Sequence, residues 1–157
     1  MPRNYKSTER FIQPDPIYNS RLVSKFVNTI MIEGKRTTAQ RIVYGAFDTL
    51  KKRIPEKEPL DVFSEALNNC RPMVEVRSKR VGGATYQVPK AVGAKRQQAL
   101  AFRWIITAAR ARKGKPMFER LADEIGEAYK REGAAVRKRE ETHRMADANK
   151  AFAHFAW

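Results

Sequence analysis

The side chains that could perform nucleophilic or metal chemistry are few in this 157-residue sequence. His143 and His154 both lie near the C-terminus, without cysteine or carboxylate partners at the spacing of a zinc site. The single cysteine, Cys70, excludes an internal disulfide and a cysteine-based zinc cluster, and its helical apolar surroundings are typical of a core residue. Because no nucleophile is accompanied by a base, the sequence predicts neither an enzyme nor a bound metal or cofactor.

Two glycine-containing segments are only superficially similar to phosphate-binding loops. Residues 81–84 lack both the G-x-G-x-x-G pattern and the Gly-Lys-Ser/Thr ending of such loops. Residues 34–37, with the sequence GKRT, resemble the end of a phosphate loop, but they follow a helical pattern and not a buried strand. The sequence therefore predicts no small-molecule substrate.

The most abundant functional side chains in the sequence are basic. The 32 Lys and Arg outnumber the 17 Asp and Glu, which gives a formal net charge of +15, and 42% hydrophobic residues suffice for a folded core. Between Glu75 and Glu119 the chain carries eleven basic residues and no acidic one. A solvated surface usually mixes both signs, so this stretch predicts a polyanionic partner such as a nucleic acid.

Within this stretch, Arg96, Arg103 and Arg110 repeat at seven-residue intervals. In a helix that turns about 100° per residue, these arginines lie within about 40° of one another, opposite the apolar face. They have no acidic neighbour four residues away on the same helix. We therefore expect their guanidinium groups to bind phosphates.

Residues 73–89 change from a helical to an alternating pattern around a Gly82-Gly83 pair, which predicts a β-hairpin. The two glycines allow a close approach of the backbone to a partner. Three cations are expected at its tip: Arg77, Lys79 and Arg80. A narrow basic ribbon suits insertion into a groove or between RNA strands. Because a lone hairpin is marginally stable in water, it must lean on the helices or on a partner.

The remaining segments predict helices. Apolar spacing, caps and breakers place them at about 20–33, 38–53, 59–71, 91–112, 116–130 and 134–149. Residues 1–19 form an extended basic arm that should stay loose until it meets a partner, because prolines and a lack of apolar periodicity oppose a helix there. The predicted fold is mainly α: a single domain of about six helices in a bundle, with one projecting β-hairpin and this N-terminal arm.

These elements predict the domain organisation: the arm at 1–19, a helical domain at 20–150 that carries the β-hairpin at 73–89 and would bind the polyanionic partner, and an aromatic tail at 151–157. The tail aromatics Phe152, Phe155 and Trp157 have three possible roles. They could close the core, stack on bases or pack on a protein neighbour. The sequence leaves these roles open. It contains no apolar run long enough to span a membrane and no secretory signal.

Several strings resemble small-subunit ribosomal protein seven of the bacterial type, and the resemblance covers essentially the whole chain. The most specific is RSKRVGGATYQVP at residues 77–89. The others are PDP at 14–16 with YNS at 18–20, GKR at 34–36 followed by Ile42-Val43 and Ala46, RQQ at 96–98 with RW at 103–104, and MADAN at 145–149 with Ala153-His154 and Trp157. The N-terminal residues 1–6 are sparser in arginine than in many bacterial members, which weakens the expected contribution of the arm.

The resemblance implies a structural protein of the small ribosomal subunit. Family members bind the 3′ major domain of the small-subunit rRNA and nucleate assembly of the subunit head. They lie at the subunit interface near the decoding region, the exit-site tRNA and the mRNA, beside the ninth and eleventh small-subunit proteins. The expected location is the ribosome in the cytoplasm, or an organelle stroma if the gene is organelle-encoded, because the N-terminus lacks a transit-like extension.

Transferred by position, the resemblance and the basic pattern together predict the site residues. The expected rRNA contacts are Arg3, Lys6, Arg10, Lys35, Arg36, Arg77, Lys79, Arg80, Gly82, Gly83, Tyr86, Lys95, Arg96, Arg103, Arg110, Arg112, Lys113 and Lys115. The residues expected near the exit-site tRNA and the mRNA are Lys79, Arg80, Val81, Gly82, Gly83, Arg144 and Trp157.

The alternative function is that of a basic DNA-binding architectural or regulatory protein. The second and third predicted helices could mimic a helix-turn-helix, and the hairpin could enter a minor groove. A helix-turn-helix needs a basic second helix, however, whereas residues 59–70 contain Asp61 and Glu65 and no Lys or Arg. An RNA-modifying enzyme is disfavoured because the nucleophile and the metal ligands are missing.

Overall fold

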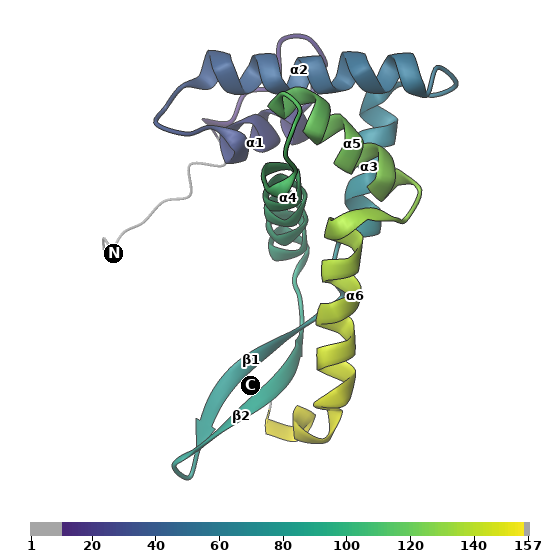
Figure 1. Ribbon diagram of the computed structural model, residues 1–157. Helices are drawn as coiled ribbons and strands as arrows, with labels where there is room; N and C mark the ends of the chain where they lie inside the picture. Colours follow the sequence, from purple (N-terminus) through teal and green to yellow (C-terminus); the bar gives the residue numbers. More distant parts are fainter. Residues whose placement is uncertain (1–10, 156–157) are drawn as a thin grey trace.

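The structure is a computed structural model that describes residues 11–155, and it confirms a mainly helical fold with one β-hairpin (Figure 1). The elements are α1 (Arg21–Ile30), α2 (Arg36–Arg53), α3 (Pro59–Cys70), β1 (Val74–Val81), β2 (Ala84–Ala91), α4 (Ala94–Ala111), α5 (Met117–Tyr129), α6 (Gly133–Ala148) and the 3-10 helix η2 (Lys150–Phe155). The hairpin projects from the end of the bundle opposite α2, and α6 runs beside it (Figure 1). Among the described helices, none is both long and apolar enough to cross a membrane.

The core forms where the apolar faces of α1 to α5 meet, together with Ala135 and Val136 of α6, and α5 packs against α2, α3 and α4. Its centre is an aromatic cluster in which the ring of Phe63 lies 4.8 Å from Phe26 and 5.3 Å from Phe47 between centroids. Apolar residues at helical spacing on α1 to α3 line this core. Cys70 is fully buried in it, and burial raises the pKa of its thiol to about 12, so that the thiol is an unreactive core group.

Two helix ends differ from the predicted ones. Helix α1 stops at Ile30 because Met31 is already extended, and the positive φ angles of Glu33 (54°) and Gly34 (72°) belong to the turn that leads into α2. Helix α4 begins at Ala94, three residues later than predicted. The reason is that Ala91 pairs with Val74 in the hairpin. Ala91 therefore belongs to β2, although helical spacing had assigned it to the start of α4.

The second half of the predicted arm is fixed to the domain. Asp15 is buried, and its carboxylate accepts hydrogen bonds from the backbone amides of Ile17 and Tyr18, each at 3.2 Å, and from the Tyr44 hydroxyl on α2 at 2.8 Å. The Tyr18 ring packs edge-on against Phe47, with centroids 5.1 Å apart. The prediction of a loose arm is therefore wrong for this segment, because an Asp-centred turn, not apolar periodicity, holds it.

Candidate nucleic-acid interface

A groove of about 570 Å³ lies between α1 and α4 and gathers basic side chains from both helices. Its described lining contains no acidic residue. Four cations line it: Lys25, Lys95, Arg103 and Arg110. Phe102 and Ile106 of α4 supply apolar lining between them, and Ile12, which precedes α1, adds a further apolar side chain. We call these four cations and the two apolar residues of α4 the α1–α4 groove.

The three arginines spaced along α4 have different surroundings. Arg103 is exposed and forms no hydrogen bond or ion pair with another described residue. Arg110 donates from one terminal nitrogen to the Ile30 carbonyl, at 3.1 Å, at the C-terminal end of α1. Arg96 is not in the groove: its Nε lies 2.7 Å from an Oε of Glu75 on β1. Arg96 has no acidic neighbour on its own helix, but β1 brings Glu75 to it, and its contact with a phosphate stays a prediction.

Glu75 joins the base of the hairpin to α4. Its carboxylate also accepts a hydrogen bond from Arg77 Nε at 2.6 Å. Burial by itself would raise the pKa of this carboxyl, but the hydrogen bonds and charges of Arg96 and Arg77 outweigh burial and hold the pKa below its usual range. The pair with Arg96 thus connects the base of the hairpin to α4, whereas the pair with Arg77 lies within β1, and the RNA-binding roles of both arginines stay predictions.

We expect Glu75→Gln to destabilise the protein at pH 7 but progressively less in acid. A carboxyl whose pKa is lowered by folding contributes stability above its unfolded pKa, about 4.3, and loses it as the pH falls through the folded value. Urea unfolding of both proteins between pH 7 and pH 2 measures this. The difference in free energy of unfolding should shrink as the pH falls below about 4.3. A difference that stays constant down to pH 2 would contradict the assignment, and the exposed Glu65→Gln serves as control.

The strand register divides the charges of the hairpin between its two faces. Lys79 pairs with Tyr86 and Arg80 with Thr85, so successive residues point to opposite sides of the ribbon. Arg77 and Lys79 therefore share the face of Glu75, while Arg80 points the other way. The expectation of three cations gathered at one tip is corrected accordingly, because only residues two apart in a strand share a face.

The tight turn of the hairpin is the one that the sequence predicts. Gly82 and Gly83 are its two central residues, with φ angles of 56° and 90°. Both lie in the left-handed region that a two-residue hairpin turn requires, and a side chain at either would meet open space. The glycines are thus needed for backbone conformation, while the surrounding space leaves the turn open to a partner.

The tail after α6 packs on the hairpin. The ring of Tyr86 lies 5.3 Å from Phe152 and 5.2 Å from Phe155 between centroids, and Lys79 Nζ donates to the Phe155 carbonyl at 2.8 Å. Of the roles left open for Phe152 and Phe155, the structure supports packing within the domain. Tyr86 and Lys79, both predicted to bind rRNA, hold this contact, and their RNA-binding roles stay predictions.

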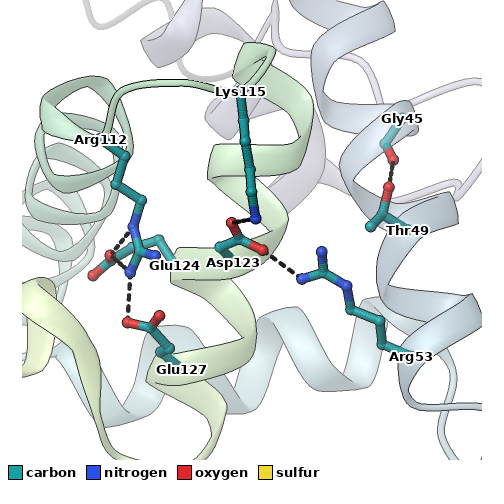
Figure 2. A network of polar contacts seen from close by, with 8 residues as sticks. All are labelled: Gly45, Thr49, Arg53, Arg112, Lys115, Asp123, Glu124 and Glu127. Atoms are coloured by element: carbon teal, nitrogen blue, oxygen red, sulfur yellow. Dashed lines mark hydrogen bonds and ion pairs between the residues drawn. The ribbon is translucent and has the colours of Figure 1, made fainter.

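Two further predicted RNA-binding residues form contacts with α5, which Figure 2 shows. Arg112 donates from two nitrogens to one oxygen of Glu124, at 3.1 Å and 2.7 Å, and also to Glu127. Lys115 binds one oxygen of Asp123 at 3.0 Å, and Arg53 of α2 binds the other at 2.6 Å. These contacts give Arg112 and Lys115 a part in joining α4, α5 and α2, which the sequence analysis did not predict.

The remaining predicted residues are dispersed. Lys35, Arg36, Lys113 and Arg144 are exposed, and Lys35 pairs with Glu33. Arg3, Lys6, Arg10 and Trp157 lie outside the described residues. His143 accepts a hydrogen bond on Nε2 from the Met73 amide at 3.0 Å and so joins α6 to the residue before β1. Over residues 11–155, no three His, Cys, Asp or Glu side chains gather as a metal site.

Lys25 is the groove residue that sequence reasoning missed. It lies on α1, away from the apolar stripe, and an isolated lysine at such a position is ordinary. The sequence shows that Lys25 lies outside the apolar stripe of α1. It does not show that this side of α1 faces α4, because the crossing of the two helices is a tertiary feature. The nearby polar residues Asn28 and Thr29 of α1 were missed for the same reason.

Comparison with known proteins finds relatives of one family that match nearly the whole chain. The family model described as Ribosomal protein S7p/S5e matches residues 2–150. A protein of Syntrophotalea carbinolica named small ribosomal subunit protein uS7 is 59% identical over 157 residues, which is 100% of both chains. Proteins of the same name from Salinibacter ruber and Thermotoga neapolitana are 56% and 54% identical over 155 residues, which is 99% of each chain.

Proposed function

Because this chain belongs to the ribosomal protein S7p/S5e family, we propose that the α1–α4 groove is its principal contact with small-subunit rRNA. The chain is a structural protein of the small ribosomal subunit that takes part in translation, and it is not an enzyme. The rRNA bound is that of the 3′ major domain, and its binding nucleates assembly of the subunit head.

The observation that carries this proposal is the convergence of four cations from two helices around one groove without an acidic residue in its described lining. Phosphates neutralise such a surface and release their condensed counterions, which is the main source of affinity in nucleic-acid binding. Arg103 supports the proposal most directly, because its guanidinium is not engaged by another described residue and offers a two-pronged donor to a phosphate.

The hairpin is a second contact, directed towards the exit-site tRNA and the mRNA. Its projection beyond the bundle, its open glycine turn and the outward Arg80 support this role (Figure 1). Arg144 is also exposed, on α6 beside the hairpin. The ninth and eleventh small-subunit proteins are the protein neighbours in this arrangement.

Competition binding tests the principal proposal. A labelled transcript of the 3′ major domain is bound to the full chain in 0.15 M salt, and unlabelled 3′ domain, 5′ domain and duplex DNA of equal length compete. We expect the 3′ domain to compete at least about a hundredfold better than DNA, because specific sites exceed non-specific ones by about 10³-fold or more in comparable systems. Equal competition by duplex DNA would instead favour the alternative DNA-binding function.

Replacement of residues 79–84 by a short turn tests the hairpin. The contacts of Glu75 at the base of the hairpin lie outside the replaced segment, so we expect the variant to fold, bind the 3′ domain and enter small subunits. Those subunits should release exit-site tRNA at an altered rate. Lys52→Met is the control, since it removes one exposed cation of α2, the helix at the opposite end of the bundle from the hairpin. Loss of binding to naked rRNA would show that the hairpin is a primary anchor, and normal tRNA release would exclude the proposed role.

A further inference from the structure

We propose that the α1–α4 groove holds a single unpaired RNA nucleotide, with its base against Phe102 and Ile106 and its phosphates at the cationic rim. The inference rests on the proposed function, because it specifies what part of the rRNA the groove takes. Proteins read RNA sequence mainly through unpaired bases that can leave the stack, since the major groove of an RNA duplex is too narrow for side chains.

The size of the groove fits a nucleotide. Its volume of about 570 Å³ lies within the range of about 300–1,000 Å³ that is usual for small-molecule sites. A contact that served only to follow a phosphate backbone would need a charged surface and no recess. The recess between α1 and α4 therefore indicates that a part of the ligand enters it.

The part of the apolar lining that α4 contributes is held by the core. Phe102 and Ile106 are each 4% exposed, so that their edges contribute to the groove while their bulk belongs to the core. The Phe102 ring is held by Phe26, at 5.1 Å, and lies nearly parallel to Phe63, at 6.5 Å between centroids. Apolar atoms gain nothing from a phosphate, whereas the face of a base gains by packing against them.

The rim of the groove supplies what the rest of a nucleotide needs. Arg103 and Arg110 lie on α4 and Lys25 on α1, so cations flank the recess on two sides and can bind the phosphates before and after the extruded base. The amides of Asn28 on α1 and Gln98 on α4 also line it, and neither is engaged by another described residue. An amide both donates and accepts hydrogen bonds, which is what recognition of a base edge requires.

A variant whose groove is filled by a larger side chain distinguishes the binding of a base from the binding of the RNA backbone. Ala99 is an exposed residue of α4 that lines the groove, so Ala99→Leu occupies the recess without altering the charge. Ala134→Leu makes the same change on α6, outside the groove, and is the matched control. Affinity for the 3′ major-domain transcript is measured for both variants and for the unaltered chain at several salt concentrations, and thermal unfolding verifies that the variants fold.

We expect Ala99→Leu to lower the affinity about tenfold while the slope of log affinity against log salt stays unchanged, because the base is lost but the phosphates are not. The control should bind as the unaltered chain does. An undiminished affinity, or a loss that comes with a shallower salt slope, would overturn the inference, since the groove would then hold backbone or nothing. If the unaltered chain itself fails to prefer the 3′ domain, the proposed function fails, and this inference with it.

Chemical probing of the Watson–Crick edges gives a second, independent readout. The bound transcript is treated with base-specific reagents for all four bases, in the presence of the unaltered chain and of Ala99→Leu. The inference requires an unpaired base that the unaltered chain protects and that Ala99→Leu leaves reactive. A protection pattern that is identical for the two proteins would overturn it, whatever their affinities.

Discussion

Glu124→Ala should lower the free energy of unfolding by about 3 kcal/mol, because it breaks a buried ion pair and leaves a buried donor unpaired. Glu124 lies in the middle of α5, and it is 0% exposed. One oxygen of its carboxylate accepts two hydrogen bonds from Arg112 (Figure 2), and the other accepts one from the Ala135 amide at 2.8 Å. The residue therefore fixes both the end of α4 and the start of α6.

The neighbouring Glu127 provides a matched control. It also binds Arg112, but its side chain is 39% exposed, so Glu127→Ala should cost less than about 1 kcal/mol. Gly133 supports the same assignment, because its φ of 90° and the 3.1 Å between a Cβ at this position and Glu124 Oε1 both favour glycine beside the carboxylate. Denaturant unfolding of the two variants measures the difference. Equal losses for Glu124→Ala and Glu127→Ala would contradict a structural role centred on the buried carboxylate.

Replacing the four groove cations by glutamine should reduce affinity for the 3′ major-domain transcript more than a hundredfold in 0.15 M salt. Each phosphate contact contributes about 0.7–0.9 to the slope of log affinity against log salt, so the slope should fall by about 3. The fold should persist, because these side chains lie on the outer faces of α1 and α4 and not in the core cluster. Filter binding at several salt concentrations measures both quantities.

The control removes the same charge elsewhere. Four exposed cations away from the groove are suitable: Lys51, Lys52, Lys130 and Arg137. Replacing them by glutamine lowers the net charge equally and should weaken binding only through the long-range field, which salt screens over about 8 Å at physiological strength. If both quadruple variants lost affinity to the same extent, net charge and not the α1–α4 groove would account for RNA binding.

Local patterns in the sequence were sufficient for the elements of the fold. The repeat of apolar residues in α1 to α3 and the alternation around Gly82 and Gly83 each reflect contacts between residues close in the chain. The ends of the helices were predicted less accurately, because they also depend on contacts between residues that are far apart in the chain. The start of α4 depended on whether Ala91 paired with Val74, and that pairing spans the whole hairpin.

The surroundings of the charged residues required the tertiary structure. Spacing along α4 placed Arg96, Arg103 and Arg110 on one side of the helix, but it said nothing of Glu75, which comes from β1 and binds only the first of them. Likewise Arg112 counted as a free cation in the sequence, although α5 brings Glu124 and Glu127 to it. A count of charges along the chain thus misses the acidic partners that other elements bring to these cations.

The sequence by itself determined the helices, the hairpin with its glycine turn, the family and the need for a polyanionic partner, because composition and short-range periodicity are properties of the chain. Only the tertiary structure decided which cations join the protein together and which surround the α1–α4 groove. The physical reason is that an ion pair or a recess forms between elements, at a distance and angle set by core packing. Lys25 and Arg103 line the same groove because the apolar faces of α1 and α4 pack in one core, and neither residue carries a local signal of the other.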